Sequence, residues 1–302
     1  MKLRITALGL AILGALTQPA DALTFSFTTI SGDTLSTDQA SAFQTAANAW
    51  STALSDPFTV SMQIGFRSLP ANVLGGSSPA LVEVNANVVK AHLAADSKSA
   101  NDAIAVSSLP TYGASDTLVL TNAQASAIGI AVDPNDGTIE FSSNYTYSTS
   151  RSAQGTIAPG TFDLVGIAEH EIGHTLGFLS SFDNPGTPAT ILDQFRYLGA
   201  GMRDTTLVPG AYFSLNGGMT KIAGFSPGQN DSYQASHWLE GTGALLDPAV
   251  SAGVVQNIAA LDLLALDVIG YDLATPVGEP TSLAMLAMGL LGVAAYRRYA
   301  AR

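Results

Sequence analysis

The chain contains no cysteine among its 302 residues, which excludes disulfide bonds and thiolate metal ligands. Charged residues are scarce at 12%, and 24 acidic residues against 12 basic ones give a net charge of −12. This balance disfavours nucleic acid and anionic membranes as partners. Histidine is also rare, with four residues, so a metal site must use few imidazoles together with carboxylates. The length and the 47% hydrophobic content allow one sizeable core, or two lobes that share a cleft.

Residues 1–22 have the pattern of an export signal. Lys2 and Arg4 give a basic start, an apolar run follows from Ile5 to Leu16, and Ala20-Asp21-Ala22 matches a cleavage site. The apolar run is short for a membrane-spanning helix. The sequence therefore predicts a signal peptide over 1–22 and a mature chain that begins near Leu23.

Residues 276–302 predict a second sorting signal. They contain Glu279-Pro280, an apolar run from Leu283 to Ala295 that is marginal for a stable span, and Arg297-Arg298. This tail resembles the PEP-CTERM signal of Gram-negative bacteria that export exopolysaccharide, except that Gly278 replaces the first proline. The resemblance implies recognition by exosortase-type sorting machinery, removal of the tail, and a secreted or cell-surface protein without a membrane span. Residues 23–275 then form the mature domain.

Hydrophobic periodicity predicts a strand, helix, strand unit at the start of this domain. Residues 23–30 and 58–66 alternate apolar and polar side chains, whereas residues 36–54 have helical spacing with Ser36 or Thr37 as the cap. A further helix is expected over 84–96 and a β-rich run over 136–148. His92 lies on the expected helix at 84–96, where a lone histidine is more often a surface or capping residue than a ligand.

The pattern in the last third of the chain is less regular. Asn216-Gly217-Gly218 predicts the tight turn of a hairpin over 212–226. Residues 254–270 predict a buried helix that ends at Gly270. The fold class expected is α+β, with a mixed β-sheet and the helix of the motif below in the N-terminal lobe, and a more irregular C-terminal lobe that contains a helix.

The segment AEHEIGHTLGFLSSFD, Ala168 to Asp183, carries the strongest chemical pattern. His170 and His174 are four residues apart, so on a helix both imidazoles lie on one face and can bind one Zn²⁺ ion. Glu171 is placed to act as general base on a water molecule at the metal. Thr161 is expected to cap this helix, Asp163 to lie in its first turn, and Gly177 to end it.

HEIGHTLGF resembles the metzincin metalloproteases, whose pattern HExxHxxGxxH places a third ligand three residues after the glycine. Here Ser180 occupies that position and is a poor zinc ligand. Asp183 is near in sequence, Asp193 lies on an expected helix, and His237 is far along the chain. All three remain candidates on residue type alone.

Leishmanolysin-like metzincins insert a segment after the glycine and supply the third ligand from a His-Trp pair, followed by a methionine-containing turn that ends in proline. His237-Trp238 and Leu245-Leu246-Asp247-Pro248 match this order, with Leu246 at the methionine position. The resemblance implies His170, His174 and His237 as the metal ligands. The chain also resembles a bacterial group of exported HEIGH metalloproteases, whose further motifs are matched here by Phe195-Arg196-Tyr197, Tyr212-Phe213-Ser214 and Ala235 to Trp238. That resemblance covers roughly Thr138 to Leu273.

The function expected is that of a secreted or cell-surface zinc-dependent endopeptidase, which acts on a protein or peptide substrate. One alternative is a non-catalytic surface or biofilm-matrix binding protein on the same scaffold, and another is zinc-dependent hydrolysis of a non-peptide amide. Glu171 favours an enzyme, because a purely structural metal site needs no carboxylate beside it. Asp183, Asp193, Asp231 and Asp247 match no calcium-loop pattern, so caps, turns or partners that support the metal ligands are expected there.

Overall fold

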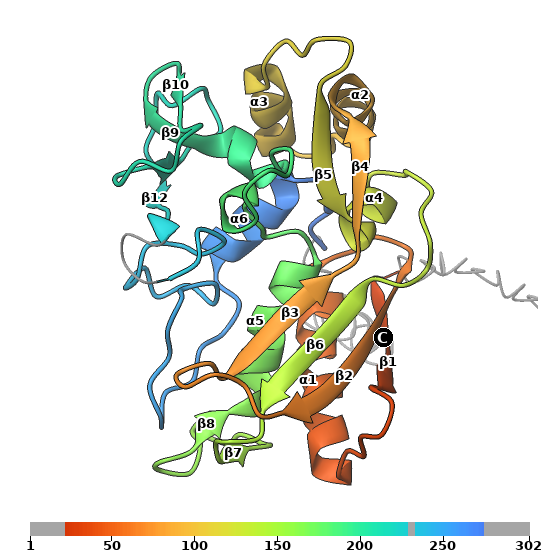
Figure 1. The fold of residues 1–302 in the computed structure, drawn as a ribbon, viewed down its shortest axis with the longest axis vertical. Coiled ribbons are helices and arrows are strands. Elements are labelled where there is room, and N and C mark those ends of the chain that lie inside the picture. Colours follow the sequence, from red (N-terminus) through yellow and green to blue (C-terminus); the bar gives the residue numbers. More distant parts are fainter. Residues whose placement is uncertain (1–21, 229–232, 275–302) are drawn as a thin grey trace, which may run out of the picture.

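The computed structural model describes residues 22–228 and 233–274, and its fold is mixed α+β (Figure 1). The expected strand, helix, strand unit is confirmed as β1 (Thr24–Thr29), α1 (Thr37–Ala53) and β2 (Thr59–Arg67). Ser36 is the cap of α1. Its hydroxyl accepts from Gln39 N at 3.2 Å, and the Gln39 side chain accepts from Ser36 N at 2.8 Å, which forms a capping box.

The main sheet has the strand order β1-β2-β6-β3, with β3 (Gly75–Pro79) and β6 (Gly137–Ser142). Strands β1, β2 and β6 are parallel, whereas β3 pairs antiparallel with β6 and forms an edge of the sheet. Helices α1 and α5 (Leu164–Thr175) lie on one face of this sheet (Figure 1). The indole Nε1 of Trp50 on α1 donates to Glu169 O at 2.9 Å, which fixes the two helices to each other.

Residues 81–127, most of which have a weak sequence pattern, form a second group of elements. Strands β4 (Leu81–Asn85) and β5 (Thr117–Thr121) form an antiparallel pair, accompanied by α2 (Ala86–Asp96), α3 (Ala100–Ser108) and α4 (Asn122–Ala127). The expected helix at 84–96 is confirmed as α2. His92 Nδ1 donates to Ile128 O at 2.7 Å, so this histidine links α2 to the end of α4.

Helix α5 carries the histidine motif and follows the short strands β7 (Tyr147–Ser148) and β8 (Phe162–Asp163). The prediction that Thr161 caps α5 is wrong, because the Thr161 hydroxyl donates to Ala158 O at 2.7 Å and Asp163 occupies the cap position. The Asp163 carboxylate pairs with Arg151 at 2.7 Å instead of with a helix N–H. At the other end the prediction is confirmed, since Gly177 has φ of 109° and ends the helix.

The chain after α5 is less regular, as expected, and is built from short elements. These are the 3₁₀ turns η1 (Ser181–Asp183) and η2 (Leu192–Phe195), the strands β9 (Arg196–Gly199), β10 (Met202–Arg203), β11 (Tyr212–Phe213) and β12 (Ala223–Gly224), and the helix α6 (Ala260–Val268). The antiparallel pairing of β11 with β12 confirms the expected hairpin, but residues 214–222 join its strands, a longer connection than the predicted tight turn.

Helix α6 is shorter than the sequence pattern predicts. It begins at Ala260, because the Asp262 carboxylate accepts from Ala259 N at 2.8 Å and so defines the first turn there. Residues 256 and 257 are held outside the helix by Arg151, which donates to Gln256 O at 3.1 Å and to Asn257 Oδ1 at 2.7 Å. Gly270 follows the helix with φ of 117°, so the predicted end is confirmed.

In the described ranges, 22–228 and 233–274, no helix combines the length and apolar character needed to cross a membrane. The predicted sorting tail at 276–302, the predicted signal peptide as far as Asp21, and Asp231 lie outside the described residues.

Candidate metal centre

Three histidine side chains from two distant parts of the chain meet beside α5. His170 and His174 project from the helix, and His237 comes from the segment that precedes Trp238. The Nε2 atoms lie 3.1 Å apart for His170 and His174, 3.2 Å for His170 and His237, and 3.3 Å for His174 and His237. The structure thus brings together the three histidines that the sequence singles out.

Backbone carbonyl groups fix the tautomer of each imidazole. His170 Nδ1 lies 2.8 Å from Leu245 O, His174 Nδ1 lies 2.8 Å from Phe178 O, and His237 Nδ1 lies 3.1 Å from Gln234 O. A carbonyl oxygen only accepts, so each Nδ1 carries the proton and donates it. Each Nε2 therefore presents a lone pair to the other two.

This donor set fits a tetrahedral metal ion such as Zn²⁺. Zinc–nitrogen bonds of about 2.0–2.1 Å in tetrahedral geometry place two histidine nitrogens roughly 3.3 Å apart, close to the separations found here. Three lone pairs that converge without a proton between them repel one another, and a bound cation removes that repulsion. No other group of three or more His, Cys, Asp or Glu side chains in the described part of the chain is arranged to hold a metal.

Burial keeps the three imidazoles neutral. It lowers the pKa of His174 to about 3, with a further contribution from the charge of His170. It also lowers the pKa of His170 and, more strongly, that of His237. Neutral imidazoles at pH 7 have their lone pairs available for a metal ion.

Glu171 lies next to the histidines on α5 and borders the same cleft. Burial raises the pKa of its carboxyl group to about 8, and a backbone hydrogen bond with Ser77 opposes that shift. Gly75 of the edge strand β3 allows the approach, since a Cβ on this residue would lie 3.1 Å from Glu171 Oε1. A cation in the histidine triangle would favour the ionised carboxylate, which can accept a proton.

Leu246 packs beneath the motif helix. An added Cβ on Gly173 would lie 2.9 Å from Leu246 Cδ2 and 3.4 Å from Trp50 Cζ2, so the glycine between the two histidines is needed for close packing. Leu246 is fully buried, and its carbonyl accepts from Trp238 N at 3.0 Å. Leu246 therefore packs against the motif helix at the glycine directly before His174.

The other candidate ligands have different partners. Asp193 accepts from Ser180 Oγ at 2.7 Å, Ser181 N at 2.9 Å and Thr190 N at 2.9 Å, which organises the turn after α5. Asp183 accepts from Ala235 N at 2.7 Å and Ser236 N at 2.9 Å.

Ser180 and Asp247 also have protein partners of their own. Ser180 donates its N–H to Ser236 Oγ at 2.8 Å, and Asp247 accepts from Gly243 N at 2.9 Å. The expectation that Asp193 and Asp247 form caps and turns is confirmed.

Asp262 is a site residue that the sequence pattern missed. It is fully buried on α6, and its carboxylate accepts from Trp238 Nε1 at 2.9 Å and from Leu246 N, in the same peptide group as Leu245 O, at 3.2 Å. It thereby holds the residue after His237 and the peptide whose carbonyl orients His170. One signal was available, because an aspartate in the apolar run ALDLLALDV must find buried donors.

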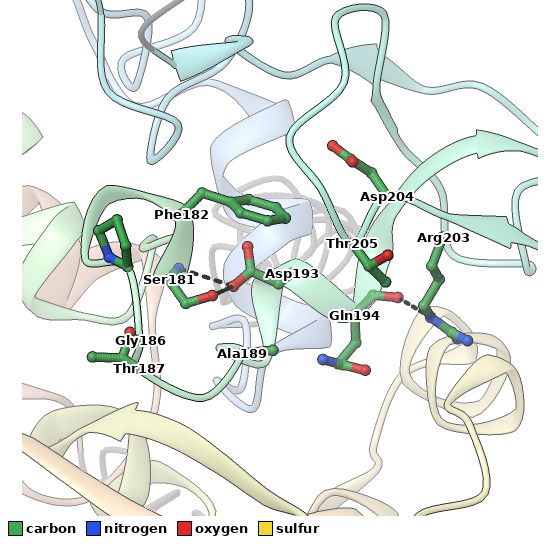
Figure 2. A pocket seen from close by; sticks show the side chains of 11 residues that line it. Ser181, Phe182, Gly186, Thr187, Ala189, Asp193, Gln194, Arg203, Asp204 and Thr205 are labelled. Atoms are coloured by element: carbon green, nitrogen blue, oxygen red, sulfur yellow. Dashed lines mark hydrogen bonds between the residues drawn. The ribbon is translucent and has the colours of Figure 1, made fainter.

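The histidines and Glu171 border a cleft of about 1250 Å³. One wall is the edge strand β3 with the residues before it, and the other is formed by residues 179–190, 233–237 and 247–250. The charged side chains along the described lining are Glu171, Asp183 and Asp247, all acidic. A separate cavity of about 370 Å³ shares Ser181 and Thr187 with the lining of the cleft and is also lined by Asp193 and Arg203 (Figure 2).

Neither models of known protein families nor curated protein sequences give a match to this chain. The resemblance to a family therefore rests on the motif residues alone.

Proposed function

We propose that this protein is a zinc-dependent endopeptidase of the metzincin type. The observation that carries the proposal is the triangle of His170, His174 and His237 Nε2 atoms, 3.1–3.3 Å apart, with Glu171 beside it in an open cleft. A structural metal site closes its coordination with protein ligands, whereas a catalytic one keeps three protein ligands and an accessible position.

Each residue has a separate task in this mechanism. The three histidines hold the metal, which when bound supplies a Lewis acid that polarises a peptide carbonyl and makes water more acidic. Glu171 takes the proton from the attacking water and then returns it to the nitrogen of the leaving amine. The carbonyl groups of Leu245, Phe178 and Gln234 keep the imidazoles in the tautomer that binds metal.

The edge strand β3 supports a peptide rather than another amide as substrate. All of Gly75–Pro79 borders the cleft, and β3 pairs with β6 on one side only. Its remaining N–H and C=O groups suit an extended chain, which binds by adding a strand to the sheet. The cleft volume of about 1250 Å³ holds several residues of such a chain.

The ends of the sequence support a place outside the cytoplasm. On the predicted signal peptide and the PEP-CTERM-like tail, we propose secretion or surface display by a Gram-negative bacterium, with exosortase-type machinery acting on residues 276–302. The mature domain would then meet protein substrates at or beyond the cell surface.

The proposal is tested with purified residues 23–275. We expect about one zinc per chain, cleavage of an unstructured protein such as casein, and loss of cleavage on removal of zinc by a chelator. Glu171→Ala should retain zinc and lose cleavage. Full cleavage by Glu171→Ala would contradict the mechanism, whereas zinc binding without hydrolysis of any peptide would favour a binding protein.

A further inference from the structure

Asp183 faces the peptide group that orients His237. Its Oδ1 accepts from Ala235 N at 2.7 Å, and the carbonyl of the same 234–235 peptide unit accepts from His237 Nδ1 at 3.1 Å. A peptide group is planar, so a bond that fixes its N–H also fixes the direction of its C=O. Asp183 is thus connected to the His237 imidazole through a single rigid unit.

The second carboxylate oxygen holds the next residue. Asp183 Oδ2 accepts from Ser236 N at 2.9 Å and from the Ser236 hydroxyl, which in turn accepts from Ser180 N at 2.8 Å. Both oxygens of Asp183 are therefore used by the two residues that precede His237. The carboxylate belongs to η1, directly after the motif helix, so it ties the His237 segment to the end of α5.

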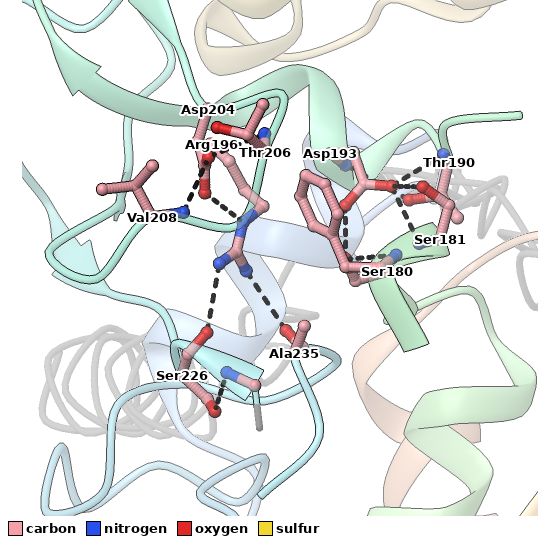
Figure 3. A network of polar contacts seen from close by, with 12 residues as sticks. Ser180, Ser181, Thr190, Asp193, Arg196, Asp204, Thr206, Val208, Ser226 and Ala235 are labelled. Atoms are coloured by element: carbon pink, nitrogen blue, oxygen red, sulfur yellow. Dashed lines mark hydrogen bonds and ion pairs between the residues drawn. The ribbon is translucent and has the colours of Figure 1, made fainter. Parts of the chain in front are cut away.

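Further bonds keep this arrangement rigid, as Figure 3 shows in part. Arg196 is 1% exposed and donates to Ala235 O at 3.2 Å and to Ser226 O at 3.1 Å. Asp193 accepts from Ser180 Oγ and Ser181 N, which fixes the chain just before Asp183 (Figure 3). The carbonyl group of His237 itself accepts from Ser226 N at 3.0 Å. The backbone on both sides of His237 is thus fixed.

We propose that Asp183 is a positioning residue that makes His237 an effective metal ligand by holding the 234–235 peptide. The carboxylate polarises this peptide group, and the carbonyl of that group then accepts the Nδ1 proton more strongly. This increases the basicity of Nε2 and fixes the ring toward the other two histidines. The inference rests on the proposed metal site but needs no hydrolysis.

The first measurement is zinc affinity by competition with a chromophoric chelator. Asp183→Asn should weaken binding by roughly 10–100-fold, the usual effect of losing a group that supports a histidine ligand. An asparagine offers only one acceptor oxygen. Its amide NH₂ group faces the other backbone N–H and cannot accept from it. Ser236→Ala leaves both backbone bonds to Asp183 in place and should have a smaller effect. Unchanged affinity in a folded Asp183→Asn protein overturns the proposal.

A double-mutant cycle separates positioning from direct ligation. If Asp183 acts only through His237, then Asp183→Asn should produce no additional loss in a His237→Ala background. If the fold losses in zinc affinity of the two single variants multiply in the double variant, Asp183 contributes independently of His237 and the proposal is overturned.

The tautomer of His237 gives a readout that requires neither zinc nor catalysis. Nitrogen-15 NMR of the metal-free protein should report the Nδ1–H form in the unaltered chain and a mixture in Asp183→Asn. If the His237 tautomer in Asp183→Asn is the same as in the unaltered chain, the proposal is contradicted, even if the protein binds no metal.

A control is Asp136→Asn, because Asp136, which is more buried than the half-buried Asp183, also has a carboxylate that accepts from a backbone N–H, that of Ser61 at 2.7 Å. It lies directly before β6 and has no bond to residues 234–237, so zinc affinity and the His237 tautomer should stay unchanged. A loss of affinity in this control equal to that in Asp183→Asn would show a general effect of removing a buried carboxylate, and would overturn the specific role of Asp183.

Discussion

Trp238 donates its indole N–H to Asp262 Oδ1 at 2.9 Å, which connects the residue after His237 to helix α6. The same carboxylate accepts from the N–H groups of Leu245, Leu246 and Ala259 at 2.9, 3.2 and 2.8 Å. Since Leu245 O orients His170, one buried side chain supports two of the three histidines. The local order of the site thus depends on a residue outside the motif.

Asp262→Ala should be among the most destabilising single changes in the chain. It leaves three backbone donors and one indole donor unsatisfied in a fully buried place, which predicts a loss of about 3 kcal/mol or more in the free energy of unfolding. Urea denaturation followed by circular dichroism measures this loss. Asp267→Ala on the same helix is the control and should lose about 1 kcal/mol, since its partners are the side chains of Ser99 and Asn101. Equal losses in the two variants would contradict the role of Asp262.

Gly173→Ala should destabilise the protein although alanine favours helices. The added Cβ would lie 2.9 Å from the fully buried Leu246 side chain, and overpacking of this kind costs about 1–3 kcal/mol against a helix-propensity gain of about 1 kcal/mol. Thermal denaturation should show a lower melting temperature, and adding Leu246→Val should restore part of the loss.

Two controls define this effect. Leu246→Met changes shape but little volume and should lose less than about 1.5 kcal/mol. Gly76→Ala lies where an added Cβ meets nothing within 4 Å, so its stability should be near that of the unaltered chain. A Gly173→Ala protein as stable as Gly76→Ala would contradict the packing argument.

Local features of this fold could be predicted from the sequence because they depend on neighbours in the chain. Apolar spacing and Ser36 define α1, and the positive φ available to Gly177 ends α5. The shared face of His170 and His174 also follows from their spacing of four residues.

Non-local contacts decided the features that the sequence missed. Thr161 is a suitable cap by residue type, but the pairing of Asp163 with Arg151 leaves the first turn of α5 without a side-chain cap. Asp183 is close to the motif and has a ligand carboxylate, yet the turn η1 directs it to residues 235 and 236. The approach of His237 depends on the bond between Trp238 and Asp262 of α6, a tertiary contact that periodicity does not reveal.

Stability should fall as pH rises through the range in which Asp56 ionises. Burial, together with the charge of Asp272, raises the pKa of Asp56 to about 7 in the folded protein. The folded state therefore holds a proton that the unfolded chain releases near pH 4, so the loss of stability begins there and is complete above about pH 7. Asp56→Asn removes this loss and still offers one acceptor to Asp272 N.

The measurement is the free energy of unfolding in urea at about pH 4 and about pH 8 for both proteins. Relative to the unaltered chain, Asp56→Asn should gain on the order of 2 kcal/mol at the higher pH and little at the lower pH. An equal difference at the two pH values would contradict a raised pKa at Asp56.

The charge of the cleft should select against acidic substrates. Glu171, Asp183 and Asp247 line it, so its charge stays negative even with the +2 charge of a bound zinc ion; Lys and Arg are absent from its described lining, and the chain as a whole has a net charge of −12. A peptide with glutamate near the scissile bond should therefore have a kcat/KM several-fold to about tenfold lower than the matched peptide with glutamine, and lysine should be tolerated. Because salt screens charges beyond about 10 Å, the difference should shrink at high ionic strength.

Fluorogenic peptides that differ at one position measure the difference in kcat/KM. The variant Asn184→Lys, at the exposed edge of the cleft, should raise the rate for the glutamate peptide. Equal rates for glutamate and glutamine peptides at low salt would contradict electrostatic selection.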